Sequence, residues 1–314
     1  MEPDSAPALP AAPRRDRINP LALRELDARM RGGHAAGLLG VLIFVTSGVA
    51  LLVYAVAALV SANQGAGASR TVGTGVFYAL VGMQLIVAAF AAPALTCGAI
   101  SGERERKTFD LLRSTALTPW QILLSKLTAS LGFSLLILLA TLPLFSLAFL
   151  LGGIELSQMG MALCLSIATA ILFSVLGLCA SCYASSTVSA VVVTYGAILL
   201  LLIGSGILLL ALSGFLLPLA AGTATGGRAA TAGESGLAQV ATLGLMSLSP
   251  ISAFVSSMLN FDNRNDMLRF SFNPSGPASS QLWPAPFVIL TVLYLLIAIV
   301  LLILAARRLS RIDP

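Results

Sequence analysis

The stretch SGERERKTFDLLRSTALTPWQILLSKL, from Ser101 to Leu127, is the longest charge-rich interruption between two strongly apolar segments of this 314-residue chain. Hydrophobic residues make up 57% of the sequence and charged residues 10%, whereas about 25% of the residues in a soluble domain are charged. The composition therefore indicates a polytopic membrane protein. The formal net charge of +5 comes from basic residues beside apolar runs, so we interpret it as a topology signal and expect no nucleic-acid partner.

Six apolar runs are long enough to cross a bilayer, which requires about 20 residues. They are residues 38–60, 75–100, 122–151, 159–183, 188–217 and 286–306. The third and fifth runs exceed one crossing, so we expect them to tilt or kink, with Pro143 as the kink in the third. The predicted fold class is an all-α polytopic membrane protein with one six-span domain, residues 35–314.

The positions of the basic residues predict which side of the membrane each segment occupies, because Lys and Arg gather at the cytoplasmic ends of spans. Of the 18 Lys and Arg residues, six precede the first span, five lie between the second and third, and three follow the sixth. Only four lie in segments that face the other side. We therefore predict a plasma or inner membrane protein with both termini and the opening stretch in the cytoplasm.

The residues before the first span divide into two predicted parts. Residues 1–17 are rich in Pro and Ala without an apolar run, which is typical of a disordered tail. Residues 18–34 offer an N-cap, a first-turn proline, an apolar face and a charged face, so they are predicted to form an interfacial helix. An ordinary cytoplasmic helix is the alternative. The predicted helix includes Asn19, Pro20, Arg24, Glu25 and Leu26.

A long region between the fifth and sixth spans begins rich in Gly, Ala and Thr. Within it, residues 237–259 are apolar enough to suggest a seventh span, but Pro250 interrupts them and a seventh span would place the C-terminal arginines outside. We predict a re-entrant or interfacial helical pair that enters from outside, which is allowed only where protein covers the broken backbone. A spanning segment is the alternative.

Capping signals divide the opening stretch into three parts. The second span ends in a charge run, residues 102–107, that is too dense for lipid. Thr108 is a suitable cap for a short amphipathic helix that follows. Thr118, Pro119 and Gln121 then provide a capping box with a first-turn proline, which predicts the start of the third span.

The short helix carries Phe109, Leu111 and Leu112 within a small loop, and an apolar patch of this kind marks a docking site for another protein. Glu103 and Arg106 lie just before it. Two interpretations of these charges stay open: they add electrostatic contacts to the same partner, or they are a solvated run that fixes topology.

These residues carry a resemblance to a known family. The stretch resembles the cytoplasmic loop of ABC-2 type transporter permeases, in which such a pattern forms the coupling helix that fits a cleft on an ATPase subunit. Residues 19–26 look like the connecting helix of the same family, and residues 249–254 are similar to its external proline-containing segment. The matching residues of the loop are Glu103, Arg104, Thr108, Leu111, Leu112, Thr118, Pro119, Lys126 and Leu127.

The resemblance implies a permease subunit of an exporter that works as a homodimer or as a heterodimer with a homologue. Two ABC ATPase subunits would dock on the loop of residues 103–117, and membrane lipid would surround the dimer. ATP-driven closure of the ATPases would move the helix around Phe109 and open a path outward. The residues implied in coupling are Glu103, Arg104, Arg106, Thr108, Phe109, Leu111 and Leu112.

Motifs for other chemistry are absent from the sequence. It has no G-x-x-x-x-G-K-[ST] loop, so we expect ATP and magnesium on the partner and neither enzymatic activity nor a bound cofactor in this chain. The acidic residues lie outside the spans or at their edges, and no Cys/His cluster has ligand spacing, so a proton relay and a metal site are not expected. The competing hypothesis is a membrane scaffold or assembly factor that recruits a cytosolic partner through the same loop.

Small and polar residues within the spans are interpreted as packing features. Cys179 and Cys182 form a C-x-x-C near a helix C-terminus, whereas a redox pair is favoured at a helix N-terminus, so helix packing is the preferred reading. Gly177 and other small residues are expected to allow close helix contact. Thr194 and Tyr195 are an alternative polar lining for a translocation path. The cargo stays open, because apolar spans do not select among lipids, glycans, peptides and drugs.

Overall fold

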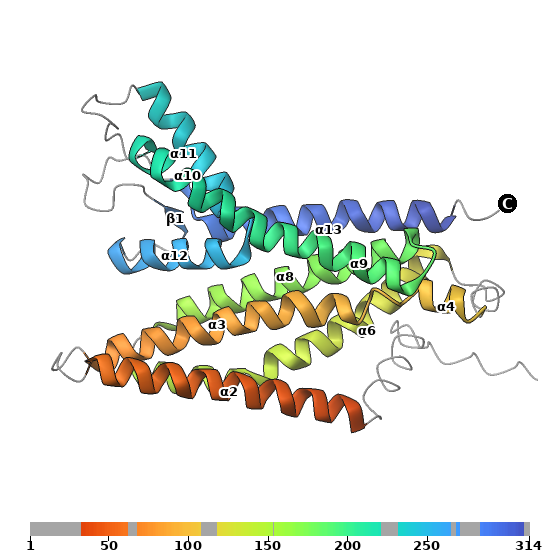
Figure 1. The fold of residues 1–314 in the computed structure, drawn as a ribbon, viewed down its shortest axis with the longest axis horizontal. Helices are drawn as coiled ribbons and strands as arrows, with labels where there is room; N and C mark the ends of the chain where they lie inside the picture. The colour runs from red at the N-terminus through yellow and green to blue at the C-terminus, as the bar shows by residue number, and fades with distance from the viewer. Residues whose placement is uncertain are drawn as a thin grey trace, which may run out of the picture.

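The computed structural model describes residues 33–61, 68–107, 118–152, 154–220, 232–264, 268–270 and 283–310, and within them the chain is a bundle of long helices (Figure 1). A π-helical turn, η2 (Leu200–Gly204), joins α9 to α10, and a short strand β1 (Arg269–Phe270) pairs antiparallel with β2 (Trp283–Pro284). The α-helices are α2 (Gly33–Ser61), α3 (Ala68–Ala94), α4 (Ser101–Glu105), α6 (Pro119–Ala140), α7 (Leu142–Leu150), α8 (Leu156–Tyr183), α9 (Thr187–Leu199), α10 (Ser205–Ala220), α11 (Ala232–Met246), α12 (Pro250–Arg264) and α13 (Pro286–Ser310).

Six helical segments of the described residues are long and apolar enough to cross a membrane. This confirms the predicted all-α, six-span membrane fold. The predicted tail and nearly all of the predicted interfacial helix at residues 18–34 lie outside the described residues, so both stay predictions. The six segments are Leu39–Val60, Val72–Ala94, Pro119–Leu150, Leu156–Tyr183, Thr187–Leu212 and Pro286–Ser310.

The second span ends earlier than its apolar run suggests. The run continues to residue 100, whereas α3 ends at Ala94 and turns follow to Ile100. The carbonyl oxygen of Pro93 accepts bonds from the backbone N–H groups of both Thr96 and Cys97, each at 2.9 Å. A carbonyl shared in this way tightens the last turn of a helix, and the chain leaves the α3 axis before it reaches α4.

The two overlong runs are both interrupted. The third span divides at Thr141 into α6 and α7, and Pro143 stands in the first turn of α7, as the sequence predicts. The fifth span contains η2, where the hydroxyl of Ser205 donates to the carbonyl oxygen of Leu201. A side chain that bonds to the backbone ladder in this way bends a helix.

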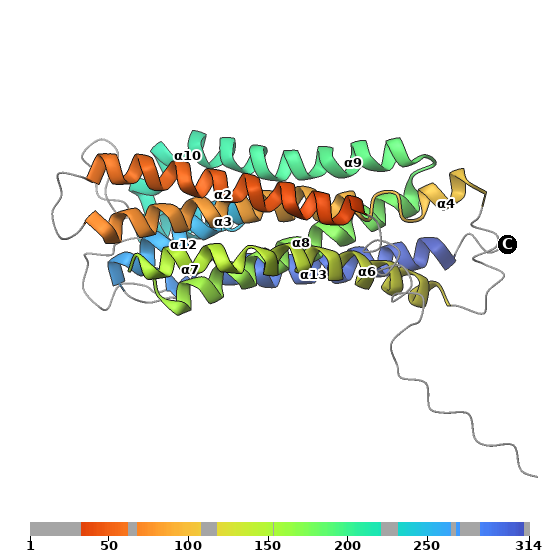
Figure 2. The same ribbon diagram turned by 90° about the horizontal axis from the view of Figure 1, so that it is seen from below.

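Helix α8 is the centre of the bundle. It lies between α3 and α13 in both views (Figures 1 and 2). In its most apolar stretch 72% of the residues are buried, compared with 11% in the corresponding stretches of the spans Leu39–Val60 and Thr187–Leu212. Aromatic rings pack in the same core: Phe77 of α3 meets Phe145 and Phe254 edge to face, with centroids 5.8 and 5.9 Å apart. The weakly buried faces of α2 and α9 are therefore available to lipid or to another chain.

The region between the fifth and sixth spans contains α11 and α12, two helices joined by a turn before Pro250. The carbonyl oxygen of Leu248 in this turn accepts a bond of 2.9 Å from the hydroxyl of Tyr294 on α13. Tyr294 is eight residues after Pro286, which places the turn about 12 Å along α13 from its start. The apolar part of α12, Pro250–Leu259, is shorter than a span; re-entry into a bilayer stays a prediction.

Candidate functional site

The predicted coupling stretch begins with α4, which lies at the end of the bundle that also holds the start of α6 and the end of α13 (Figures 1 and 2). Lys107 follows α4 with a φ of 56°, and its N–H donates to the carbonyl oxygen of Arg104 at 3.0 Å. This left-handed residue ends the helix and redirects the chain. Thr108, Phe109, Leu111 and Leu112 lie outside the described residues.

The chain is described again from Thr118, where α6 begins with the predicted capping box. The backbone N–H of Thr118 donates to the side-chain oxygen of Gln121 at 2.9 Å, and the N–H of Gln121 donates to the Thr118 hydroxyl at 3.4 Å. Pro119 occupies the first turn, where a missing N–H costs nothing. Along the chain, α4 and the capped start of α6 therefore stand on either side of residues 108–117.

A serine from α8 caps the start of α4. Ile100, the N-cap residue of α4, has no polar side chain, so the first N–H groups of the helix need another acceptor. The hydroxyl oxygen of Ser181 accepts bonds from the N–H groups of Ile100 and Ser101 at 3.0 and 2.9 Å. Ser101 and Ser181 are fully buried, and their hydroxyls lie 3.2 Å apart. This contact fixes α4 to the end of α8.

The carboxylate of Glu105 holds the start of α9. The backbone N–H and the hydroxyl of Thr187 donate to its two oxygens, each at 2.8 Å. Thr187 is the first residue of α9, where free N–H groups and the helix dipole both favour a negative charge. These bonds lower the pKa of Glu105 below its ordinary value of 4.5, so the exposed carboxylate is ionised at neutral pH.

An ion pair connects α4 to α6. Lys126 Nζ lies 2.7 Å from Glu103 Oε1, and the side chains are 6% and 26% exposed. Lys126 lies near the start of an apolar run, a position that favours a side chain extended to the membrane interface, but here the side chain is buried against α4. A buried ammonium group needs a partner of opposite charge because its desolvation is costly. Arg104 adds a longer bond of 3.4 Å from Nη1 to the carbonyl oxygen of Ala184.

The bonds described above fasten α4 to three spans, and we call the residues that make them the α4 latch. Glu103 and Arg104, predicted to act in coupling, make contacts within the chain, whereas Arg106 is exposed. Sequence reasoning missed the contact partners on α8 and α9, which are about 80 residues away along the chain and carry no signal of pairing. The α4 latch consists of Ser101, Glu103 and Glu105 of α4, Lys126 of α6, Ser181 of α8 and Thr187 of α9.

The turn between α3 and α4 packs closely on α8. A Cβ atom at Gly177 would lie 2.4 Å from Thr96 Oγ1 and 3.2 Å from the carbonyl oxygen of Pro93. The expected close contact therefore exists at Gly177, but a Cβ at Gly196 or Gly206 would meet nothing within 4 Å. Only the first of these glycines is required by packing.

Tyr195 and the two cysteines of the C-x-x-C make contacts within the bundle. The hydroxyl of Tyr195 donates to the carbonyl oxygen of Phe90 at 2.8 Å, and the two rings stack with centroids 5.8 Å apart, which joins α9 to α3. Cys179 and Cys182 are buried free thiols. Within the described ranges, no group of three His, Cys, Asp or Glu residues is placed to hold a metal ion.

Comparison with known proteins identifies a family. The model of a family described as "ABC-2 family transporter protein" matches residues 20–313, which include every described helix. None of the curated proteins matches the chain.

Proposed function

Because the chain belongs to the ABC-2 family of transporter proteins, in which the permease is the transmembrane subunit and not the ATPase, we propose that it is the permease of an exporter driven by a separate ATPase subunit. The match confirms the resemblance carried by Ser101–Leu127, and the six spans make the chain a multi-pass membrane protein. The partner, its docking site and the direction of transport are the proposed parts.

The observation that carries the proposal is the α4 latch beside the 108–117 loop. A docking loop transmits force only if its ends are fixed to the elements that must move. Here Glu103 connects α4 to α6, Ser181 connects it to α8, and Glu105 connects it to α9. The loop therefore follows a helix that is bonded to three spans. Helix α3 leads into the same helix from the other side.

The proposal divides the predicted coupling residues into two groups, those that contact the ATPase and those that act within the chain. The apolar side chains of Phe109, Leu111 and Leu112 enter a cleft of the ATPase subunit, with Thr108 capping their helix and exposed Arg106 adding an electrostatic contact. Glu103 and Arg104 act within the chain, where they hold α4 in place. Closure of the ATPases on ATP and magnesium displaces this helix, and the latch passes the displacement to α6, α8 and α9.

The complex contains two permease chains, identical or homologous, and two ATPase subunits. The sparse burial of the α2 and α9 spans supports pairing, since each offers a long apolar face. The charge-rich end of the bundle, with α4 and Arg307 and Arg308 in the last turn of α13, is the cytoplasmic end. Asn19, Pro20, Arg24, Glu25 and Leu26 belong to an interfacial helix at the same side.

Co-purification tests the docking site. The chain is expressed with the ATPase from the neighbouring reading frame, and Phe109→Ala with Leu112→Ala is expected to abolish co-purification, because the apolar contact is lost. Arg113→Ala is the matched control in the same loop and is expected to retain the ATPase. Undiminished co-purification of the double variant would refute docking at this loop.

Direction is tested separately. Deletion of the permease in its native cell is expected to raise the cargo inside the cell and lower it in the medium, as comparative analysis of metabolites and lipids would detect. Loss of uptake from the medium would instead identify an importer. Normal distribution of every compound, together with an intact ATPase complex, would favour the scaffold or assembly-factor alternative.

A further inference from the structure

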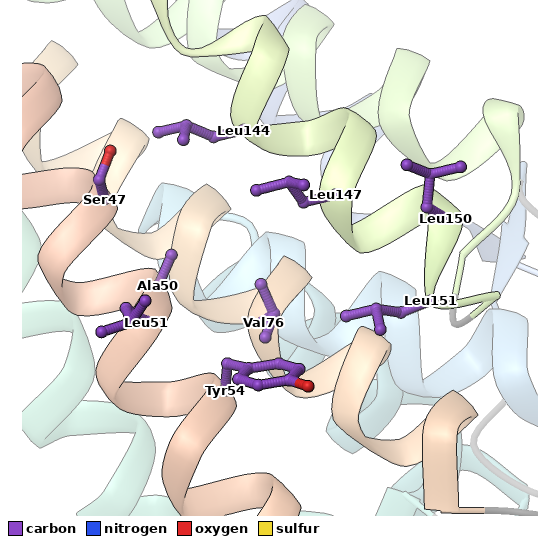
Figure 3. A pocket seen from close by; sticks show the side chains of 9 residues that line it. All are labelled: Ser47, Ala50, Leu51, Tyr54, Val76, Leu144, Leu147, Leu150 and Leu151. Carbon is purple, nitrogen blue, oxygen red and sulfur yellow. The ribbon is translucent and has the colours of Figure 1, made fainter.

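An apolar pocket of about 500 Å³ separates α2 from α7 (Figure 3). It lies in the half of the bundle away from α4, where α7 and the second half of α2 are found (Figure 2). Val76 of α3 and Ala50 of α2 form its floor and are 4% and 9% exposed. The volume falls within the range of about 300–1,000 Å³ that is typical of small-ligand sites.

The walls of the pocket are almost wholly aliphatic. Leu144 and Leu147 of α7, and Leu151 just after it, extend toward α2, and the ring of Tyr54 lies across from them (Figure 3). Leu147 is 55% exposed and Leu150 78% exposed, so the mouth of the pocket opens on the outer surface of the bundle. This is a groove with a buried floor, in contrast to the ordinary convex surface of a helix.

The surroundings of the mouth identify what enters it. Both bounding helices belong to membrane-spanning segments, Leu39–Val60 and Pro119–Leu150. The mouth therefore faces hydrocarbon and not water. Unfilled space would cost its lining atoms their dispersion contacts, and the molecules within reach are phospholipid chains.

We propose that this groove is a binding site for one acyl chain of a membrane phospholipid, held between α2 and α7. With the charge-rich end in the cytoplasm, as proposed above, the phospholipid belongs to the outer leaflet. Hydrocarbon tails are as apolar as leucine, so shape and packing drive the binding and the headgroup is not selected. The inference needs only the membrane-spanning fold and does not depend on an ATPase.

Photo-crosslinking in lipid nanodiscs tests the site with the full-length chain. The probe is a phosphatidylcholine with a diazirine in the middle of one acyl chain, and adducts are mapped by peptide mass spectrometry. Adducts are expected to concentrate on the two walls, residues 47–54 and 144–151. The exposed face of α13, around Val292 and Leu296, is the internal reference for lipid that merely surrounds the bundle.

Two filling variants make the test specific. Ala50→Trp fills the groove from its floor and Leu147→Trp fills it from the opposite wall, and each is expected to remove most wall adducts while α13 adducts persist. Leu52→Trp, on the same helix but outside the lining, is the matched control. Size-exclusion elution like that of the parent protein establishes that each variant is folded.

Three outcomes would overturn the proposal. Wall adducts no more frequent than those on the exposed face of α13 would mean ordinary annular lipid. Wall adducts that survive both filling variants would mean that the lipid lies outside the groove. Unlabelled walls in the parent protein, with adducts present on α13, would mean that no acyl chain enters the groove.

Discussion

The ion pair of Lys126 and Glu103 illustrates what a single residue reveals only in three dimensions. In the sequence Lys126 lies near the start of an apolar run, which favours a side chain that extends to the interface. In the structure it is 6% exposed and bonded to an acid 23 residues earlier. The density of charge at residues 102–107 predicts that the chain has left the lipid there. No local pattern specifies which of the acidic residues in this run faces the bundle.

Removing one partner of this pair tests its contribution. Lys126→Met is expected to lower the free energy of unfolding by about 3–5 kcal/mol, because it leaves Glu103 without its counter-charge in a partly buried position. The double variant Lys126→Met with Glu103→Gln is expected to recover most of the loss. Thermal unfolding of the purified chain in detergent measures both, and an unchanged melting temperature for Lys126→Met would contradict the assignment.

Glu105 makes the α4 latch sensitive to acid. Its folded-state pKa is lowered by the two bonds from Thr187, so the folded state binds its proton less tightly than the unfolded state. The stability that it contributes is present above the ordinary pKa of 4.5 and is lost as pH falls through the lower folded-state value. The difference in melting temperature between the parent protein and Glu105→Gln should be present at pH 7 and vanish in acid; a pH-independent difference would argue against the bond.

At the scale of elements, the sequence predicts helices better than their ends. Apolar runs gave all six spans, and Pro143 gave the break in the third, because length and proline chemistry are local properties. The end of α3 at Ala94 could not be derived from an apolar run that continues to residue 100. It depends on the packing of the following turn against Gly177, which is a tertiary contact.

Gly177 is the test of that packing. Gly177→Ala is expected to destabilise the protein by about 1–3 kcal/mol, because its Cβ would lie 2.4 Å from Thr96 Oγ1 and close to backbone. Gly160→Ala on the same helix meets nothing within 4 Å and is expected to be neutral or to stabilise by up to about 1 kcal/mol. Equal melting temperatures for the two variants would show that α3 and α8 do not approach as described.

At the scale of the whole molecule, composition and basic-residue positions predict the class, the number of spans and the orientation. They do not predict that one short helix joins three spans, since the contacts of Glu105 and Ser101 reach residues about 80 positions away. The predicted interfacial helix and most of the predicted coupling helix lie outside the described residues and stay predictions. The family match spans residues 20–313, which include the coupling stretch and all but the first two residues of the predicted interfacial helix.

The α4 latch should separate docking from coupling. Glu105→Gln with Thr187→Val removes the joint to α9 but leaves the 108–117 loop unchanged, so the ATPase is expected to co-purify while permease-dependent stimulation of its ATP hydrolysis is lost. Thr128→Val, in which an exposed hydroxyl bonded only within its own helix is removed, is the control. Hydrolysis by the reconstituted complex measures the effect, and full stimulation in the double variant would mean that force bypasses α9.

The most direct measurement is photo-crosslinking from position 109 in the assembled complex. A photoreactive amino acid in place of Phe109 is predicted to crosslink to the ATPase subunit, and the yield is predicted to change when ATP closes the ATPase pair. The same amino acid in place of Val240, on the opposite end of the bundle, is predicted to give no such product. Crosslinking to the ATPase from position 240 and not from position 109 would contradict both the orientation and the docking site.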